Sequence, residues 1–339
     1  MSPNPARYDL HMTMLAASPL KRLSRPDMPP SFRMTERDFD ILSFVASVRC
    51  ATSDQISRRV GGSPRGVRSR LKHLFRAGYL DRPKQQHAYL AAFFDEGNHP
   101  LVYALARKGA RLLAERGAPV DHRLDWTTKN NRATAPFLAH TVDVAEAMLG
   151  FHFPTLDTVF FRLIDHADLV PLMPEETQTK RDPFKLSVTI EHNHKPLHLA
   201  VVPDRLFSLA FADSTRMNFA LELDRGTMDI NAKRIVGKSS FRKKLIGYYH
   251  AWQQKKHTQT WGFERLRVLT ITPSEKRLAN MLKAQREVTK NAASGLFLYT
   301  TPERLAAHGP FASVWTTSKA DGISLLPSTR SSMETTDAR

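Results

Sequence analysis

The sequence has very little cysteine and no long apolar stretch. Its single cysteine, Cys50, excludes an intramolecular disulfide and a zinc site made of cysteine ligands, and this usage is typical of a reducing compartment. Because no run reaches about 18 apolar residues, no transmembrane helix is expected. The N-terminus lacks the apolar segment of a secretory signal. We therefore expect a cytoplasmic protein that does not enter membranes.

Motifs of several enzyme classes are missing as well. The sequence contains no phosphate-binding P-loop, no GxGxxG after a predicted strand and no HExxH. These absences weigh against an ATPase, a dinucleotide-binding enzyme and a zinc protease.

Acidic residues are scarce relative to basic ones. The 339 residues include 33 Asp and Glu against 50 Lys and Arg, a formal net charge of +17. Such an excess predicts a polyanionic partner, and nucleic acid is the commonest one. A hydrophobic content of 41% is sufficient for packed cores, and the length predicts two domains.

The residue pattern divides the chain into five parts. They are a disordered basic arm (1–33), a winged helix-turn-helix domain (34–118), a linker (119–136), a mixed α/β domain (137–316) and a disordered tail (317–339). The fold class we expect is therefore mixed α/β.

Three short helices open the first domain. Thr35 and Ser53 are predicted N-caps of the first two, and Ser63-Pro64 opens the third, since proline is favoured in the first helical position. An extended stretch and the helix 107–116 follow. Three helices, a two-stranded ribbon and a closing helix are the elements of a winged helix-turn-helix.

The third helix has two faces. Val67, Leu71 and Leu74 lie at helical spacing and predict a buried stripe. Basic and polar residues share the opposite face, as in a recognition helix that contacts phosphates and bases: Arg65, Arg68, Ser69, Lys72 and Arg76. We add Lys84, from the predicted wing tip 82–87, as a DNA-binding residue. The alternative is a solvated basic face in a winged helix that contacts proteins.

Strands alternate with helices in the second domain. We predict strands at 197–204, 266–272 and 295–301 and a hairpin made of 206–211 and 218–224. Helices are predicted at 137–151, 241–256 and 274–290. This order favours an α/β sheet that is partly parallel.

Three carboxylates gather around the predicted hairpin. Glu222 and Asp224 share one face of their strand by its period of two, and Asp204 ends the preceding strand. Clustered carboxylates repel one another unless a cation lies between them, and Mg²⁺ prefers such oxygen ligands. The alternative is structural: Pro203-Asp204 forms a turn, and the acids of ELDR pair with Arg205 or Arg225.

Asp204 and Glu222 resemble the acidic pair of PD-(D/E)xK nucleases. That resemblance implies a nuclease-like domain over 137–316 with Asp204, Glu222 and Lys244 as catalytic residues, since Asp224 stands where the family has lysine. Lys243 is the other candidate for the displaced lysine. The helix that carries His140, Asp143 and Glu146 is the expected source of a third acid. The implied Mg²⁺ ligands are Asp204, Glu222 and Glu146.

The layout of the chain is also similar to that of the replication-relaxation family. The matching pieces are YALARKGARLLAE (103–115), AHTVDVAEAML (139–149), VPDRLF (202–207), FALELDRGT (219–227), Lys244-Leu245 with Tyr248, LRVLTIT (266–272) and GLFLYTT (295–301). The resemblance implies a DNA-binding protein of plasmid or mobile-element replication, relaxation or transfer. The missing lysine two residues after Glu222 favours a nuclease-like domain that is inactive.

Two other functions stay open. One is a Mg²⁺-dependent DNA endonuclease, and the other is a protein-interaction scaffold or transcriptional regulator. The expected partners are double-stranded DNA, a relaxase, replication or recombination protein, and a second copy in a homodimer. The segment 225–268 supports contact with a polyanion, because it carries 11 basic and 2 acidic residues. Tyr248, Tyr249 and Trp252 in this segment either stack on bases or form the core face of their helix.

Overall fold

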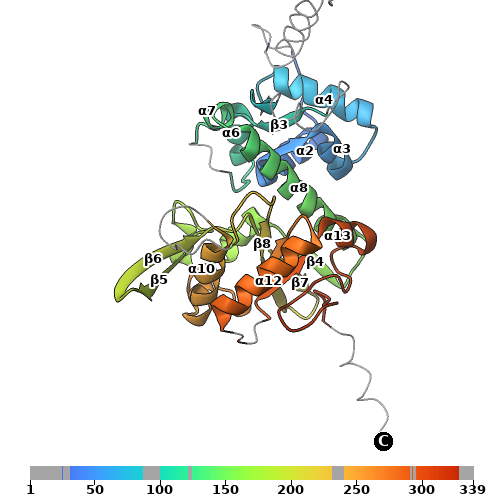
Figure 1. Ribbon diagram of the computed structural model, residues 1–339. Helices are drawn as coiled ribbons and strands as arrows, with labels where there is room; N and C mark the ends of the chain where they lie inside the picture. Colours follow the sequence, from blue (N-terminus) through green and yellow to red (C-terminus); the bar gives the residue numbers. More distant parts are fainter. Residues whose placement is uncertain are drawn as a thin grey trace, which may run out of the picture. The chain divides into compact units, whose positions relative to one another are not determined.

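The computed structural model describes residues 25, 31–86, 100–120, 124–230, 240–290, 292 and 295–327. It has two compact units, Met1–Leu149 and Gly150–Arg339, and the mixed α/β class is confirmed (Figure 1). Most of the predicted basic arm lies outside the described residues. No helix among the described residues is long and apolar enough to cross a membrane.

The first unit contains helices around a small antiparallel sheet. Its strands are ordered β1-β3-β2. Its elements up to residue 131 are α2 (Glu36–Val48), β1 (Cys50–Thr52), α3 (Ser53–Val60), α4 (Pro64–Arg76), β2 (Leu80–Asp81), β3 (Val102–Leu105), α6 (Arg107–Glu115) and α7 (Trp126–Asn131). The three predicted helices, the extended stretch and the closing helix all occur in this order. The short strand β1 and the helix α7 were not predicted.

Capping residues define where the first helices begin. Thr35 caps α2, and Ser63 accepts a hydrogen bond from Gly66 N at the start of α4, where Pro64 is the first helical residue. The predicted cap of α3 is wrong by one residue. Thr52 is the N-cap there, because its hydroxyl accepts from Gln55 N while the Gln55 side chain accepts from Thr52 N.

The boundary between the units differs from the predicted linker 119–136. α8 (Ala135–Leu156) begins within that range, and its residues up to Leu149 belong to the first unit. Leu138 and Val142 pack in one apolar cluster with Cys50, Val102 and Ala104. This burial explains why the lone cysteine behaves as a small apolar residue.

The second unit is built on a five-stranded sheet of order β10-β9-β8-β7-β4. Its elements after α8 are β4 (Phe161–Ile164), η1 (His166–Leu172), α9 (Glu175–Gln178), β5 (Leu186–His192), β6 (Lys195–Val201), β7 (Arg205–Phe211), β8 (Arg216–Leu223), α10 (Phe241–Gln253), α11 (Lys256–Trp261), β9 (Arg267–Ile271), α12 (Glu275–Thr289), β10 (Phe297–Thr300) and α13 (Pro302–His308).

The direction of the strands follows from their connections. β4, β7 and β8 are antiparallel, and β7 and β8 form the predicted hairpin around the turn 212–215. α10 and α11 then lead to β9, which runs parallel to β8, and α12 leads to the parallel strand β10. α10 and α12 lie side by side over this sheet (Figure 1). The sheet is thus partly parallel, as predicted.

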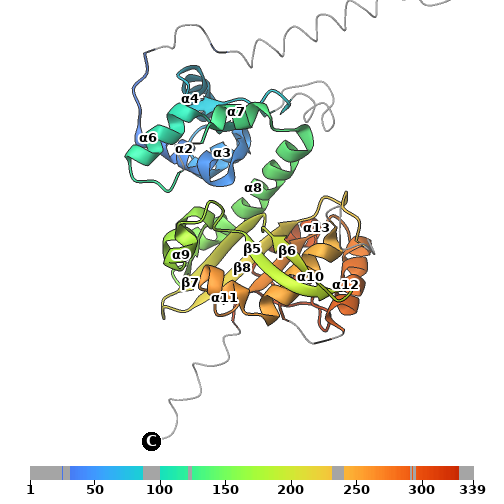
Figure 2. The same ribbon diagram turned by 90° about the vertical axis from the view of Figure 1, so that its left-hand side faces the viewer.

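A separate antiparallel hairpin, β5–β6, is inserted between β4 and β7. Its inner side chains, such as Leu186, Val188 and Val201, join the core cluster that includes Leu245 and Tyr248 of α10. Figure 2 shows the hairpin lying over α10.

The start of the predicted disordered tail is ordered. Trp315 pairs with Ile323 in an isolated β-bridge, and Leu325 is fully buried. Residues 317–327 therefore extend the second unit, because the bridge to Ile323 and the burial of Leu325 hold them in place. Residues 328–339 lie outside the described part of the chain.

Candidate functional site

The strand register of β7 and β8 brings Asp204 close to Glu222. Arg205 is paired with Leu221, so the residue before β7 lies beside the end of β8. The carboxylate of Asp204 accepts a hydrogen bond of 2.8 Å from the backbone N–H of Leu223. The predicted pair of acids therefore meets where β7 begins and β8 ends.

Glu222 is the buried member of this pair, with 5% of its surface exposed. One carboxylate oxygen accepts from Nζ of Lys244, and the other accepts from the hydroxyl of Tyr248 at 2.6 Å. Burial raises the pKa of Glu222, and the charge of Asp204 adds to this, so the pKa lies at about 7 although Lys244 and Tyr248 oppose the shift.

Lys244 and Tyr248 reach the same carboxylate because they are four residues apart on α10. Gly247 lets this helix approach β6, since a Cβ there would lie 2.7 Å from Cγ1 of Val201. Burial lowers the pKa of Lys244, but the charges of Glu222 and Asp204 outweigh it and leave the pKa above its ordinary value. Burial also raises the pKa of Tyr248, with Glu222 adding to the effect, so its hydroxyl stays a proton donor.

Asp224 has a different role from its neighbours. Its carboxylate forms a two-pronged ion pair with Arg277 of α12 and also accepts from the hydroxyl of Thr272 at 2.9 Å. Arg277 donates to the carbonyl of Met228 as well, at 2.6 Å. The acid in the position of the family lysine thus ties β8 to α12. Sequence reasoning missed Arg277, since nothing in the local pattern connects it to Asp224.

The predicted third acid, Glu146, lies in the first unit. Its carboxylate accepts from Nε2 of Gln55 at 3.0 Å and from the guanidinium of Arg58 at 2.9 Å. Across the described ranges, no group of three or more His, Cys, Asp or Glu side chains could hold a metal ion. The candidate metal ligands that the structure brings together are Asp204 and Glu222.

In the first unit, α4 presents the predicted basic face to solvent. The outward residues are all exposed: Arg65, Arg68, Ser69, Lys72 and Arg76. On the opposite face, Val67, Leu71 and Leu74 are completely buried. This buried apolar stripe packs α4 firmly against the rest of the first unit. The four basic side chains and the serine hydroxyl of the exposed face are therefore carried by a well-fixed helix.

The predicted wing tip is partly packed into the first unit. Lys84 is exposed, but Gln86 is fully buried and hydrogen bonded to Val102 and Pro83. Arg82 donates to the hydroxyl of Tyr103 at 2.9 Å. His87 lies outside the described residues. Lys84 is thus the basic residue of this segment that is open to a ligand.

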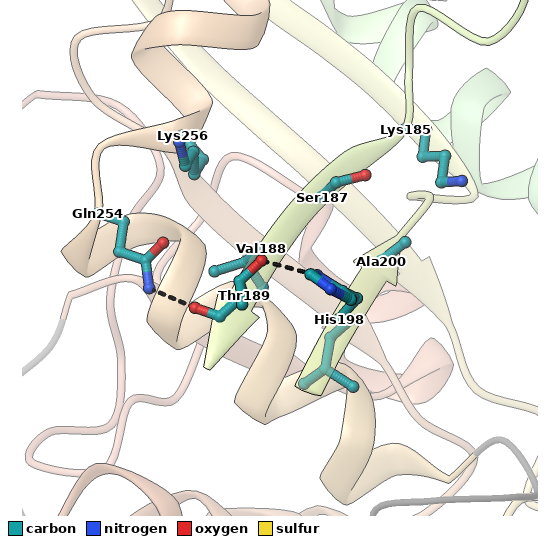
Figure 3. A pocket seen from close by; sticks show the side chains of 9 residues that line it. Lys185, Ser187, Val188, Thr189, His198, Ala200, Gln254 and Lys256 are labelled. Carbon is teal, nitrogen blue, oxygen red and sulfur yellow. Dashed lines mark hydrogen bonds between the residues drawn. The ribbon is translucent and has the colours of Figure 1, made fainter. Parts of the chain in front are cut away.

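A groove of about 420 Å³ lies on the β5–β6 hairpin of the second unit. Figure 3 shows the hydroxyl of Thr189 and Nδ1 of His198 sharing a hydrogen bond of 2.8 Å, while Gln254 donates to the carbonyl of Thr189. Lys185 and Lys256 also line the groove. The predicted catalytic residues are not among its lining residues, so it is a separate feature.

Fold and site together define a mixed α/β protein with an exposed basic helix and a carboxylate–lysine centre around the buried Glu222. The chain belongs to the replication-relaxation family, whose model matches residues 42–263. The match includes α4, Asp204, Glu222 and Lys244. No curated protein and no solved structure matches the chain. Family membership suggests a role in the replication or relaxation of plasmids or other mobile elements. It also suggests involvement with DNA and with the replication machinery.

Proposed function

We propose that this protein binds double-stranded DNA through α4 during the replication, relaxation or transfer of a plasmid or other mobile element. The observation that carries the proposal is the exposed basic face of α4, opposite a completely buried apolar face. Membership of the replication-relaxation family supports the biological setting. In this proposal the first unit is a winged helix-turn-helix DNA-binding domain.

The chemistry of α4 suits a phosphate backbone and base edges. Arginine forms paired hydrogen bonds with phosphate and with guanine, and lysine acts as a compact positive charge. The net charge of +17 favours encounter with DNA in general. The position of the cations on one helix face is what makes α4 the contact surface, because charge alone does not select a face.

Fluorescence anisotropy with a mixed-sequence duplex of about 30 base pairs, roughly three helical turns, tests this proposal. The variant Arg65→Ala/Lys72→Ala should bind more weakly. The slope of log K, the logarithm of the binding constant, against the logarithm of the salt concentration should become less steep by about 0.9 for each lost phosphate contact. The matched control is Lys276→Ala/Lys283→Ala, which removes two exposed lysines of α12 in the second unit. Equal behaviour of both variants would contradict a DNA contact on α4.

A metal-dependent DNA endonuclease is the second candidate function. The observation that favours it is the ammonium of Lys244 on the carboxylate of Glu222, beside Asp204. A lysine next to an acidic pair can stabilise the negative charge that develops when a phosphodiester is attacked. A carboxyl with a strongly raised pKa in such a cluster is itself a sign of a functional site.

Two carboxylates completed by water are a donor set that Mg²⁺ accepts. Asp204 and Glu222 would hold the ion, and Mg²⁺ would activate a water molecule for hydrolysis. Each oxygen of Glu222 already accepts a hydrogen bond, from Lys244 or from Tyr248, so a metal ion would have to share these oxygens with both donors. The exposed cations of α4 need no such sharing, and this is why we rank DNA binding above cleavage.

Incubation of supercoiled plasmid with the protein and Mg²⁺, Mn²⁺ or EDTA tests the second candidate. An active endonuclease should nick the plasmid with either metal, and Asp204→Ala or Glu222→Ala should abolish nicking. A mobility shift without nicking, equal in wild type and variants, would rule out the second candidate and leave the first.

A further inference from the structure

A second basic surface lies in the first unit, next to the C-terminal end of α4. It is a groove of about 460 Å³ whose charged lining residues are all basic. We call it the α6 groove, lined by Arg25, Gly78, Arg107, Lys108, Arg111 and Thr127. We propose that the α6 groove binds the phosphate backbone of duplex DNA next to the stretch contacted by α4. This inference rests on the proposed DNA binding and extends it to a second contact surface.

Close packing fixes α6 against the turn that follows α4. Gly109, Ala110 and Leu113 form the buried face of α6. A Cβ at Gly109 would lie 2.3 Å from the carbonyl oxygen of Tyr79, so the helix backbone lies directly on this turn. The exposed face of α6, with Arg107 and Arg111, is therefore held at the end of α4.

Two of the four cations are held in place by the protein itself. Arg25 donates to the carbonyls of Phe75 and Leu80 at 2.9 and 2.7 Å and to the carboxylate of Asp81 at 2.5 Å. Lys108 lies over the ring of Tyr79, 4.3 Å from its centre. Cations held in this way lose little conformational freedom when an anion binds.

The acids near the groove offset only part of its positive charge. Asp81 already accepts from Arg25 and from the amide of Asn130. Asp125, close to Arg107, accepts from the backbone N–H and the hydroxyl of Thr128. Four cations against two engaged carboxylates leave the groove with an excess of positive charge.

The order of charges along α6 points the same way. The first turn carries Arg107 and Lys108, where the helix dipole favours negative groups. A bound phosphate would relieve this unfavourable arrangement. Positions that break a local rule in this way tend to serve a ligand.

The groove also adjoins the surface proposed for DNA binding. Gly78 lines the groove only two residues after Arg76, the last exposed cation of α4. A duplex contacted along α4 carries its negative charges past this point, since phosphates follow each other closely along each strand. We therefore assign the groove to duplex DNA rather than to a protein.

The test compares three variants of the whole protein that each remove two positive charges: Arg107→Ala/Arg111→Ala in the α6 groove, Arg65→Ala/Lys72→Ala on α4, and Lys276→Ala/Lys283→Ala on α12. For each variant, fluorescence anisotropy with a duplex of about 30 base pairs gives the binding constant K at several salt concentrations, and so the slope of log K against log salt concentration. We expect the α6 variant to lose about 1.8 in slope, for two phosphate contacts, and the α12 variant to match wild type. Arg107→Lys/Arg111→Lys keeps both charges and should recover most of the slope.

Three other outcomes would overturn the inference that the α6 groove binds DNA. If the α6 variant matches wild type while the α4 variant loses slope, the α6 groove does not contact DNA and the proposed function stands. If the α6 and α12 variants lose the same slope, only total charge matters. If wild type does not bind the duplex, both the proposed function and this inference fail.

Discussion

At the scale of single residues, the ionisation of Glu222 is the feature with the clearest consequence. Its pKa is raised to about 7 by burial and by Asp204. Between its ordinary pKa and about 7, the folded protein holds a proton that the unfolded chain has already released. The free energy of unfolding therefore decreases as pH rises through this window, by at most about 3 kcal/mol.

Glu222→Gln removes this ionisation but keeps an oxygen that can accept from Tyr248. We expect urea unfolding at pH 5 and pH 8 to show a smaller loss of stability in Glu222→Gln than in wild type. Glu303→Gln, at an exposed position of α13, serves as the control and should keep the wild-type dependence. Identical pH dependence in Glu222→Gln and wild type would show that Glu222 does not titrate in this range.

The same residues show what the sequence could and could not predict about the site. The strand pattern predicted that Asp204 lies beside the strand that carries Glu222, and the register of β7 and β8 brings the two residues together. The spacing of Lys244 and Tyr248 on one helix contained the signal for their shared contact with Glu222, although the role of Tyr248 was not predicted. The partners of Glu146 and Asp224 could not be predicted. They are Arg58 and Arg277, which are distant from these acids in the sequence.

At the scale of elements, caps and periodic apolar residues predicted the long helices well. β4, with four residues at the edge of the sheet, gave no usable pattern. The helix 137–151 was predicted, but the division at 119–136 failed to anticipate α7 and the packing of α8 on the first unit. Local propensity cannot show which side of a boundary a helix packs against.

The contact between α6 and the turn after α4 leads to a prediction about stability. Gly109→Ala should destabilise the first unit by about 3 kcal/mol, since the new Cβ would collide with the backbone oxygen of Tyr79, which cannot easily move. Gly150→Ala is the matched control: this glycine of α8 has open space around its Cβ position, and alanine in a helix should add up to about 1 kcal/mol.

Thermal unfolding of both glycine variants measures the difference. A lower midpoint for Gly109→Ala and an equal or higher midpoint for Gly150→Ala are expected. If the two variants unfold at the same temperature, α6 does not pack as closely on the turn as its geometry indicates.

At the scale of the whole molecule, two kinds of chemistry are divided between two units. The first unit carries the exposed cations of α4, and the second carries the buried Glu222 with the half-buried Asp204 and Lys244. An exposed basic face can bind a polyanion favourably without breaking hydrogen bonds within the protein. A centre whose charged groups already bond to one another gains less from a further ligand, because that ligand competes with the existing hydrogen bonds.

We therefore predict that the two units can be disabled separately. Asp204→Ala should leave the affinity for duplex DNA and its salt slope unchanged, whether or not wild type nicks plasmid. Arg65→Ala/Lys72→Ala should weaken binding, and any nicking should decrease with it, because cleavage requires bound DNA. Anisotropy and plasmid nicking measured on the same preparations check both expectations. A loss of duplex affinity in Asp204→Ala comparable to that of the α4 variant would contradict this division, because it would place the buried centre itself on the DNA-binding surface.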